Sequence, residues 1–190
     1  MYALDAAHET AGRITRDYQL DIHISDRFPD DPPFVYEVGG QIPREPDFHV
    51  NGDNTLCVGS PLAVRRALRR WPNVRSFLAR TLRPYLYAVT VKLDTGRDFV
   101  FGELRHGTAG QLQDLADDLR LPEDQVINAI NLMLMPSAEA DDQPCICGCG
   151  GVVSNCALRD RLGEVRDLFS ATSLRVLRDE IQTLLSVQHR

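Results

Sequence analysis

The sequence predicts an α+β fold, a small antiparallel sheet followed by helices. Residues 14–24 alternate apolar and polar side chains, and residues 34–38 are aromatic or β-branched apart from Glu37, as expected of two strands. Apolar residues then recur at helical spacing in 61–70 and 74–87, and again after residue 107. A run of strands that precedes a run of helices is the order typical of an α+β protein.

The first forty residues are expected to form a short helix and then the two strands. Residues 1–13 have a weak apolar period, which predicts the helix. The half-buried face of the first strand would consist of Tyr18, Leu20, Ile22 and Ile24. The prolines of FPDDPP at 28–33 interrupt the sheet, because proline has no N–H for the ladder and restricts the residue before it.

Two helices are expected between residues 61 and 87. Pro61 stands at a favoured first-turn position, and Pro84 predicts a kink or an early end of the second helix. Arginines crowd this region, at positions 65, 66, 69, 70, 75, 80 and 83. They form either a solvated face or a docking patch for an acidic partner. Strand character follows at 88–93 and 99–104, and we expect Glu103 and His106 to make structural hydrogen bonds.

The rest of the chain is predicted to be helical. Gly110–Arg120 and Glu123–Met135 have the spacing of a helix-turn-helix DNA module, but the second helix has no basic residue to hold phosphate. We therefore expect both helices to pack against the core. The predicted parts are a core at 1–106, a helical extension at 107–136, a polar linker at 137–144, and a cysteine cluster with a helical hairpin at 145–190.

Length and composition exclude several classes of protein. With 190 residues, 43% of them hydrophobic, the chain can build a core. The net charge of −6 argues against generic nucleic-acid binding, which needs an excess of basic charge. No apolar run reaches the roughly 18 residues of a membrane span, and the first residues lack a signal-peptide pattern. We expect a cytoplasmic protein without nucleic-acid or membrane partners.

Cys57 is the first candidate for chemistry. It follows the polar turn cluster at 51–54, so we expect it on an irregular surface segment, where reactive groups are often found. His49 and Asn51 stand shortly before it in the chain. The alternative is a buried cysteine that serves as a small hydrophobe.

Residues 18–87 resemble the catalytic core of the ubiquitin-conjugating enzymes, in the divergent form found in prokaryotes. The resemblance rests on FPDDPP at 28–33, on His49-Val50-Asn51, on Leu56-Cys57 and on the helix after Trp71. Eukaryotic members have His-Pro-Asn at the triplet and a longer spacing to the cysteine. The resemblance implies an antiparallel sheet with helices over one face.

The resemblance also implies a transferase. The thiolate of Cys57 would accept the C-terminal acyl group of a ubiquitin-like modifier and pass it to an amine of a target protein. Asn51 would stabilise the oxyanion or organise the loop, and His49 would hold the loop together. Because the sequence has no glycine-rich phosphate loop, a separate activating enzyme is implied. Such prokaryotic members stand in operons with activating and deconjugating partners, often in antiphage defence.

Lys92 is the only lysine of the chain. A carrier of an activated acyl group benefits from few amines, and arginine is a poor acyl acceptor because it stays protonated. A GC-rich genome is the alternative explanation.

A second candidate site consists of Cys145, Cys147, Cys149 and Cys156. An odd total of five cysteines and this close spacing favour a metal over disulfides. Three of the four, with the glycines at 148 and 150, resemble the SEC-C type of zinc motif, whose fourth ligand directly follows the third cysteine. That position is Ala157 here, so Cys149 would complete a closed four-sulfur site for structural zinc. Redox-active thiols and a motif that has lost its metal are the alternatives.

The sequence therefore predicts a bacterial enzyme of ubiquitin-like conjugation that forms a thioester on Cys57 and carries a structural zinc in its tail. Its expected partners are the modifier, the activating enzyme and a protein target. The alternative is a non-catalytic, zinc-containing adaptor that only binds other proteins.

Overall fold

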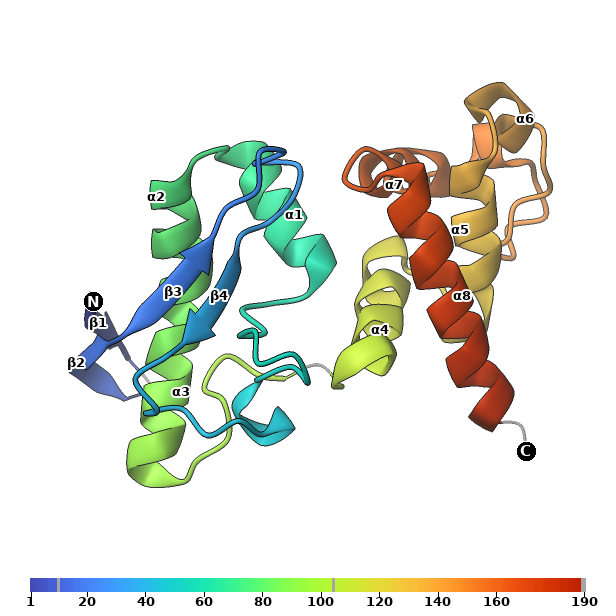
Figure 1. Cartoon of the computed structure of the whole chain (residues 1–190). Coiled ribbons are helices and arrows are strands. Elements are labelled where there is room, and N and C mark those ends of the chain that lie inside the picture. Colours follow the sequence, from blue (N-terminus) through green and yellow to red (C-terminus); the bar gives the residue numbers. More distant parts are fainter. Residues whose placement is uncertain (10, 104, 189–190) are drawn as a thin grey trace. The chain divides into compact units, whose positions relative to one another are not determined.

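The computed structural model describes residues 1–9, 11–103 and 105–188, and it divides into two compact units (Figure 1). Unit 1 is Met1–Glu103 and contains all the strands, together with helices α1 to α3. Unit 2 is Leu104–Arg190 and its regular elements are helical. The α+β class expected from the sequence is confirmed.

Unit 1 begins with four antiparallel strands that pair two by two. β1 (Tyr2–His8) pairs with β2 (Gly12–Tyr18), and β3 (Leu20–His23) pairs with β4 (Phe34–Glu37). The helix expected at 1–13 is therefore wrong, because this segment forms β1 and the turn into β2. The single strand expected at 14–24 is divided at Gln19, whose carbonyl accepts the N–H of Val38 at 2.8 Å instead of continuing one ladder.

The helices of unit 1 follow as α1 (Pro61–Arg70), α2 (Val74–Phe77), a π-helical segment (Leu78–Leu82) and α3 (Arg83–Thr95). Pro84 lies in the first turn of α3, directly after the π-helical turn in which Arg83 donates to the carbonyl of Leu78. The irregularity expected at Pro84 is present in this form.

The strand expected at 88–93 is wrong, because α3 continues to Thr95. This helix is buried on nearly all sides from Tyr85 to Val91, so its sequence reads as a continuous apolar run that fits a strand equally well. Residues 99–103 also lack a strand and form turns and irregular backbone. Leu104, the last residue of that expected strand, lies outside the described residues.

The core of unit 1 joins the sheet residues to one side of the helices. The hydroxyl groups of Tyr18 and Thr90, both fully buried, lie 2.7 Å apart and link β2 to α3. Other buried residues of the unit 1 core include Leu4, Val35, Val50, Leu56, Leu68, Phe77, Leu82 and Leu86. Val50 and Leu56 belong to the segment that holds the first candidate site, so that segment is fixed by core packing.

Unit 2 contains α4 (Gly107–Leu119), α5 (Val126–Leu134), α6 (Ser137–Asp141), α7 (Leu158–Arg166) and α8 (Ala171–Gln188). Helices α4 and α5 pack against α7 and α8, so the expected extension and the expected tail share one core. The segment 137–144, expected as a linker, contains α6 and buries Ala140. Among the described residues, no helix has the length and apolar character needed to cross a membrane.

A buried carboxylate organises the turn after β4. Both oxygens of Glu37 accept backbone N–H groups, from Gly39 at 2.8 Å, Gln41 at 2.9 Å and Ile42 at 3.4 Å. Ile42 is itself part of the core. Loss of the carboxylate would leave several donors of this turn without a partner.

We expect Glu37→Ala to lower the free energy of unfolding of unit 1 by about 2 kcal/mol, the cost of leaving such donors unsatisfied. Urea unfolding followed by the fluorescence of Trp71, the only tryptophan, measures this unit alone. Glu45→Ala, at an exposed position, is the matched control and should change stability by less than about 0.5 kcal/mol. Equal effects of the two substitutions would contradict the assignment.

Candidate functional site

Residues 49–57 form a small hairpin that brings Cys57 beside His49. The N–H of Cys57 donates to the carbonyl of His49 at 2.7 Å, and Val50 and Leu56 form an antiparallel bridge. Leu56 also donates to the carbonyl of Val35 in β4 at 2.8 Å, which ties the hairpin to the sheet. The position of Cys57 is therefore set by backbone hydrogen bonds and by two buried side chains.

The tip of the hairpin is a polar network centred on Thr55. The backbone N–H of Asn51 donates to the carbonyl of Thr55 at 2.8 Å, and the Asn51 side-chain amide donates to Thr55 Oγ1 at 2.9 Å. The Thr55 hydroxyl in turn donates to Asp53 Oδ1 at 2.7 Å. This hydrogen bond, together with one from the Thr55 backbone N–H to the same oxygen at 3.0 Å, holds the pKa of Asp53 below its usual value. Asn54 closes the turn in a left-handed conformation, at φ 66°.

His49 is held by aromatic and acidic neighbours. Its backbone is left-handed, with φ 53° and ψ 46°, and caps a 3-10 turn at Pro46–Phe48. Its ring lies edge-on to Phe99, with centroids 4.4 Å apart, and its Nε2 lies 3.8 Å from Glu103 Oε1. Glu103 also accepts the backbone N–H of Phe99 at 3.2 Å, so the structural role expected for this carboxylate agrees with its contacts. His106 lies directly before α4 in unit 2.

The Cys57 side chain is half-buried, and its Sγ lies 3.9 Å from the carbonyl of Gly59. Burial raises the pKa of the Cys57 thiol. The buried hydroxyl of Tyr85 lies nearby and donates to the carbonyl of Phe48 at 2.9 Å. Burial, with smaller contributions from Tyr18, Cys57 and Glu37, raises the pKa of Tyr85 far above its usual value, so its hydroxyl stays a neutral donor.

Lys92 lies in the same region and is withdrawn from solvent. Its side chain is 9% exposed, and Nζ lies 3.1 Å from Asp47 Oδ2. The ammonium group also stands over the rings of Phe48 and Phe99, at 5.7 Å and 5.5 Å from their centroids. The single lysine of the chain thus holds the loop at 46–49 against the residues after α3.

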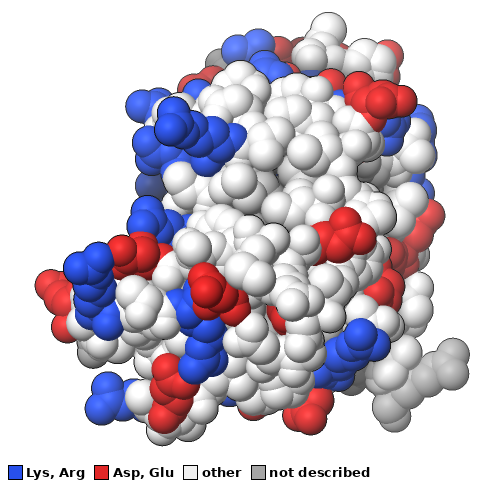
Figure 2. Space-filling view, turned by 60° about the vertical axis from the view of Figure 1, so that its left-hand side comes forward, with Lys and Arg blue, Asp and Glu red and all other residues white. Residues whose placement is uncertain are grey.

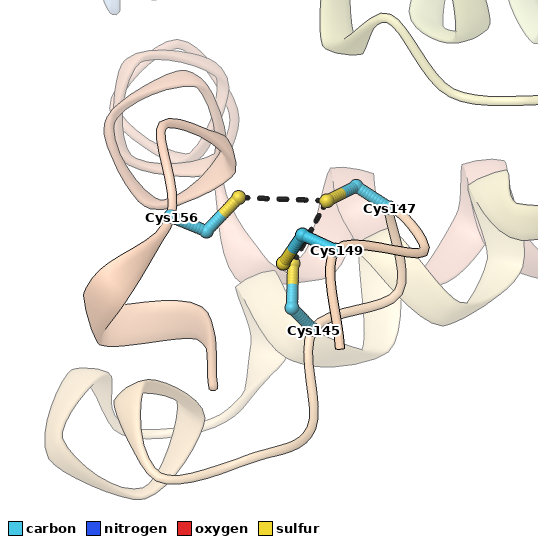
Figure 3. A group of neighbouring side chains, drawn as sticks. All are labelled: Cys145, Cys147, Cys149 and Cys156. Atoms are coloured by element: carbon cyan, nitrogen blue, oxygen red, sulfur yellow. Dashed lines mark hydrogen bonds between the residues drawn. The ribbon is translucent and has the colours of Figure 1, made fainter. Parts of the chain in front are cut away.

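The four cysteines of unit 2 form a compact group of sulfur atoms (Figure 3). All four Sγ atoms lie within 4.8 Å of one another, with 3.2 Å between Cys145 and Cys147 and 3.5 Å between Cys147 and Cys156. Sulfurs at the corners of a tetrahedral site with metal–sulfur bonds of about 2.3 Å are about 3.8 Å apart. The group therefore has the composition and the spacing of a site that can hold a metal ion.

The chain folds into this group through two glycines and a backbone clamp. Gly148 and Gly150 have φ of 84° and 76°, a left-handed conformation that other residues rarely adopt. The N–H of Cys145 donates to the carbonyl of Gly151 at 2.8 Å and closes the loop. The knuckle is thus formed by local backbone geometry.

The last cysteine of the group has a polar environment. Cys156 Sγ accepts the backbone N–H of Leu158, the first residue of α7, at 3.5 Å. This hydrogen bond, with contributions from the neighbouring thiols, lowers the pKa of Cys156 to about 7. Burial is the main cause that raises the pKa of Cys145. A metal ion binds thiolates, so a site that already stabilises one thiolate favours metal binding.

The structure places the residues proposed from sequence in two separate sites. It brings Cys57 next to His49 through the backbone, but the amide of Asn51 is bonded to Thr55 and not to Cys57. It brings all four clustered cysteines together, including Cys149. Tyr85 and Phe99 were not predicted from the sequence, and Glu103 was predicted only to make a structural hydrogen bond. All three reach the first site from distant parts of the chain.

Comparisons with known proteins returned no match: the chain fits no protein-family model, and no curated protein or solved structure matches it. The resemblance of residues 18–87 to the ubiquitin-conjugating enzymes therefore remains an expectation drawn from the sequence.

We expect the rate of alkylation of Cys57 by iodoacetamide to reach its inflection at a higher pH in the native protein than in the unfolded chain, because burial raises the pKa of this thiol and only the thiolate reacts. Mass spectrometry of the peptide that contains Cys57 measures the rate. The same peptide in urea-unfolded protein is the control and should show its inflection near about 8.5. A native inflection at or below that of the unfolded chain would contradict the environment described for Cys57.

Proposed function

We propose that the protein is a ubiquitin-like conjugating enzyme, which carries a modifier as a thioester on Cys57 and transfers it to an amine on a target. The observation that carries this proposal is the position of Cys57, half-buried beside His49 at the end of a hairpin fixed to the core. A cysteine on a rigid, partly exposed loop can meet a protein-bound carbonyl, whereas a core cysteine cannot.

The reaction consists of two acyl transfers. In the first, the Cys57 sulfur loses its proton and attacks the modifier's thioester carbonyl on an activating enzyme, whose own cysteine leaves as thiolate. In the second, a target amine attacks the new thioester, so that a C–N bond forms, the C–S bond breaks and the amine loses a proton. Cys57 leaves as thiolate and regains a proton.

The raised pKa of Cys57 suits a carrier. A thiol of higher pKa is a poorer leaving group, so its thioester resists water and unintended amines for longer. The cost is a small thiolate fraction at neutral pH, which slows loading. The balance favours an intermediate that persists until the target arrives.

Asn51 supports this chemistry as an organiser of the loop. Its side-chain N–H to Thr55 Oγ1 and its backbone bonds to residues 54 and 55 stabilise the hairpin whose end is Cys57. An amide nitrogen carries two hydrogens, and the second is available to a substrate oxyanion. Val50, where eukaryotic members have proline, donates its N–H to the carbonyl of Glu45 at 3.4 Å, a bond that proline cannot make.

The burial of Lys92 is consistent with a carrier of activated acyl groups. The only lysine side chain is ion-paired with Asp47 and nearly inaccessible, so it is a poor acceptor for a modifier held on Cys57. The other 20 residues of the Lys and Arg total are all arginines, whose side chains remain protonated and unreactive toward thioesters.

We expect incubation with an activating enzyme, ATP and the modifier to give an adduct that reductant removes. Non-reducing gel electrophoresis and mass spectrometry detect it. Cys57→Ala should abolish the adduct, because this substitution removes the proposed acyl acceptor. Cys149→Ser, a substitution at an exposed cysteine of the other site, is the matched control and should retain the adduct.

The alternative function is a non-catalytic adaptor, and the same experiment separates the two. If the activating enzyme becomes charged with modifier but wild-type protein never forms the adduct, the chain is not a carrier. The adaptor function would then be the better explanation, because the binding surfaces and the cysteine group would be the remaining functional features.

We propose that the four cysteines hold a zinc ion in a structural role. Four thiolates in a closed tetrahedral set are the donor type typical of structural zinc, which then has no open position for a substrate. Zinc would supply bonds that join the loop at 145–149 to the start of α7, through Cys156. Because α4, α5, α7 and α8 already share an apolar core, zinc adds to the stability of unit 2 and does not replace its core.

Elemental analysis of purified protein should give about one zinc per chain. Cys149→Ser should weaken zinc binding by roughly tenfold or more and lower the melting temperature, since one of the four thiolates is lost. Cys57→Ser should retain the metal, because Cys57 lies in the other unit. Metal-free wild-type protein with an ordered loop at 145–156, seen by NMR, would contradict the zinc site.

A further inference from the structure

Positive charge is concentrated in one part of the chain. Eight of the 21 Lys and Arg residues lie in 54–93, a segment without any Asp or Glu, so all 27 acidic residues lie elsewhere. Figure 2 shows a group of Lys and Arg side chains gathered on one side of the surface, next to a wide uncharged area. An acidic protein that keeps one purely basic segment has a marked charge asymmetry.

Four exposed arginines of this segment lie around the turn between α1 and α2. Arg69 and Arg70 end α1, Arg75 lies in the first turn of α2, and Arg80 lies in the π-helical segment. Trp71 lies at the turn, half-buried, with the guanidinium of Arg80 at 3.8 Å and that of Arg70 at 5.1 Å from its ring centroid. We call Arg69, Arg70, Trp71, Arg75 and Arg80 the arginine surface.

The arginine surface has no acid of its own. Among the described residues, no ion pair joins its four arginines to a carboxylate. Two neighbouring arginines are used differently, because Arg65 donates to the carbonyl of Asp30 and Arg83 to that of Asp5. Those two arginines hydrogen-bond to backbone carbonyls of the fold. The four arginines of the surface are exposed and have no ion pair with the described residues of this unit.

Helix electrostatics explains only half of the surface. Cations are favoured at a helix C-terminus, so Arg69 and Arg70 stabilise the end of α1. Arg75 is in the first turn of α2, where the helix dipole disfavours a cation, and Arg80 gains only its contact with Trp71. Unpaired like charges on adjacent elements lower stability, so their presence indicates a use outside the fold.

We propose that the arginine surface docks an acidic segment of a partner protein. Arg and Trp are among the residue types that contribute most of the binding energy in protein interfaces, and guanidinium groups form bidentate hydrogen bonds with carboxylates. The Asp and Glu side chains elsewhere on the chain repel a long polyanion such as nucleic acid. A short acidic segment can contact the arginine surface without reaching those carboxylates. The surface is separate from Cys57. Cys57 lies just before the start of α1, whereas Arg69 and Arg70 lie at its end, roughly 14 Å further along the helix axis.

The test uses the full chain and an oligoglutamate peptide as the partner's stand-in. Because Trp71 is the only tryptophan and lies in the surface, its fluorescence reports binding there directly. Wild-type protein should bind oligoglutamate, more weakly at higher salt, and should not bind the matching oligoglutamine peptide. The double variant Arg69→Glu, Arg75→Glu should weaken binding at least about tenfold, the effect of losing two charge pairs.

The matched control is the double variant Arg44→Glu, Arg97→Glu, which changes net charge equally at exposed arginines outside the surface. It should bind within about twofold of wild type. Arg69→Gln, Arg75→Gln repeats the test without charge reversal if the glutamate variant melts at a lower temperature.

Three kinds of result would overturn the proposal, which are no binding, a net-charge effect and a different occupant. One is absence of oligoglutamate binding to wild type, and another is equal weakening by both double variants, which would be a net-charge effect. The third is tighter binding of duplex DNA than of oligoglutamate, or a concentration-dependent dimer that Arg69→Glu, Arg75→Glu abolishes. In that third case the occupant is a nucleic acid or a second copy of the chain. None of these measurements involves Cys57 or an activating enzyme, so they are independent of the proposed transferase activity.

Discussion

The backbone hydrogen bond between the N–H of Cys57 and the carbonyl of His49 is the contact on which the candidate site depends. It closes the hairpin at 49–57 and fixes the position of Cys57 relative to His49. The hairpin itself is anchored on its inner side, where Val50 and Leu56 enter the core and Leu56 donates to β4. Because backbone groups near a core must be paired, the hairpin cannot move without losing several hydrogen bonds together.

Secondary structure was predicted correctly where the hydrophobic pattern of a segment is clear. It was predicted wrongly where tertiary burial overrides the local pattern or propensity. The alternation over 14–24 predicted strand correctly, although the structure divides it into β2 and β3, and the helical spacing over 61–70 predicted α1. The first residues, with Ala6 and Ala7 at their centre, have a helical tendency, yet they pair in full register with β2 and pack on α3. In α3, Val89 and Val91 favour a strand by propensity, but a helix buried on nearly all sides accommodates them.

The two candidate sites differ in how far sequence could predict them. The cysteine group lies within twelve consecutive residues, and Gly148 and Gly150 mark the turns that close it, so spacing alone identified it. The surroundings of Cys57 come from residues up to half the unit away, such as Tyr85 and Glu103. No local pattern encodes such contacts, because they arise only when α3 and the residues after it pack under the hairpin.

The pKa values of Cys57 and Cys156 are shifted in opposite directions, because burial dominates at Cys57 and a backbone hydrogen bond dominates at Cys156. Cys156 accepts an N–H from the first residue of a helix, which stabilises the thiolate and suits a permanent metal ligand. Cys57 is close to a helix start as well, since Ser60 caps α1, but the Ser60 side chain accepts the N–H of Ala63. The Cys57 sulfur lies against the backbone of Gly59 instead. The hydrogen bond there lowers the pKa of Cys57 by less than burial raises it, so the pKa of this thiol is raised overall. A thiol of raised pKa is also a poorer leaving group, so under the proposed transferase function the thioester on Cys57 would persist longer.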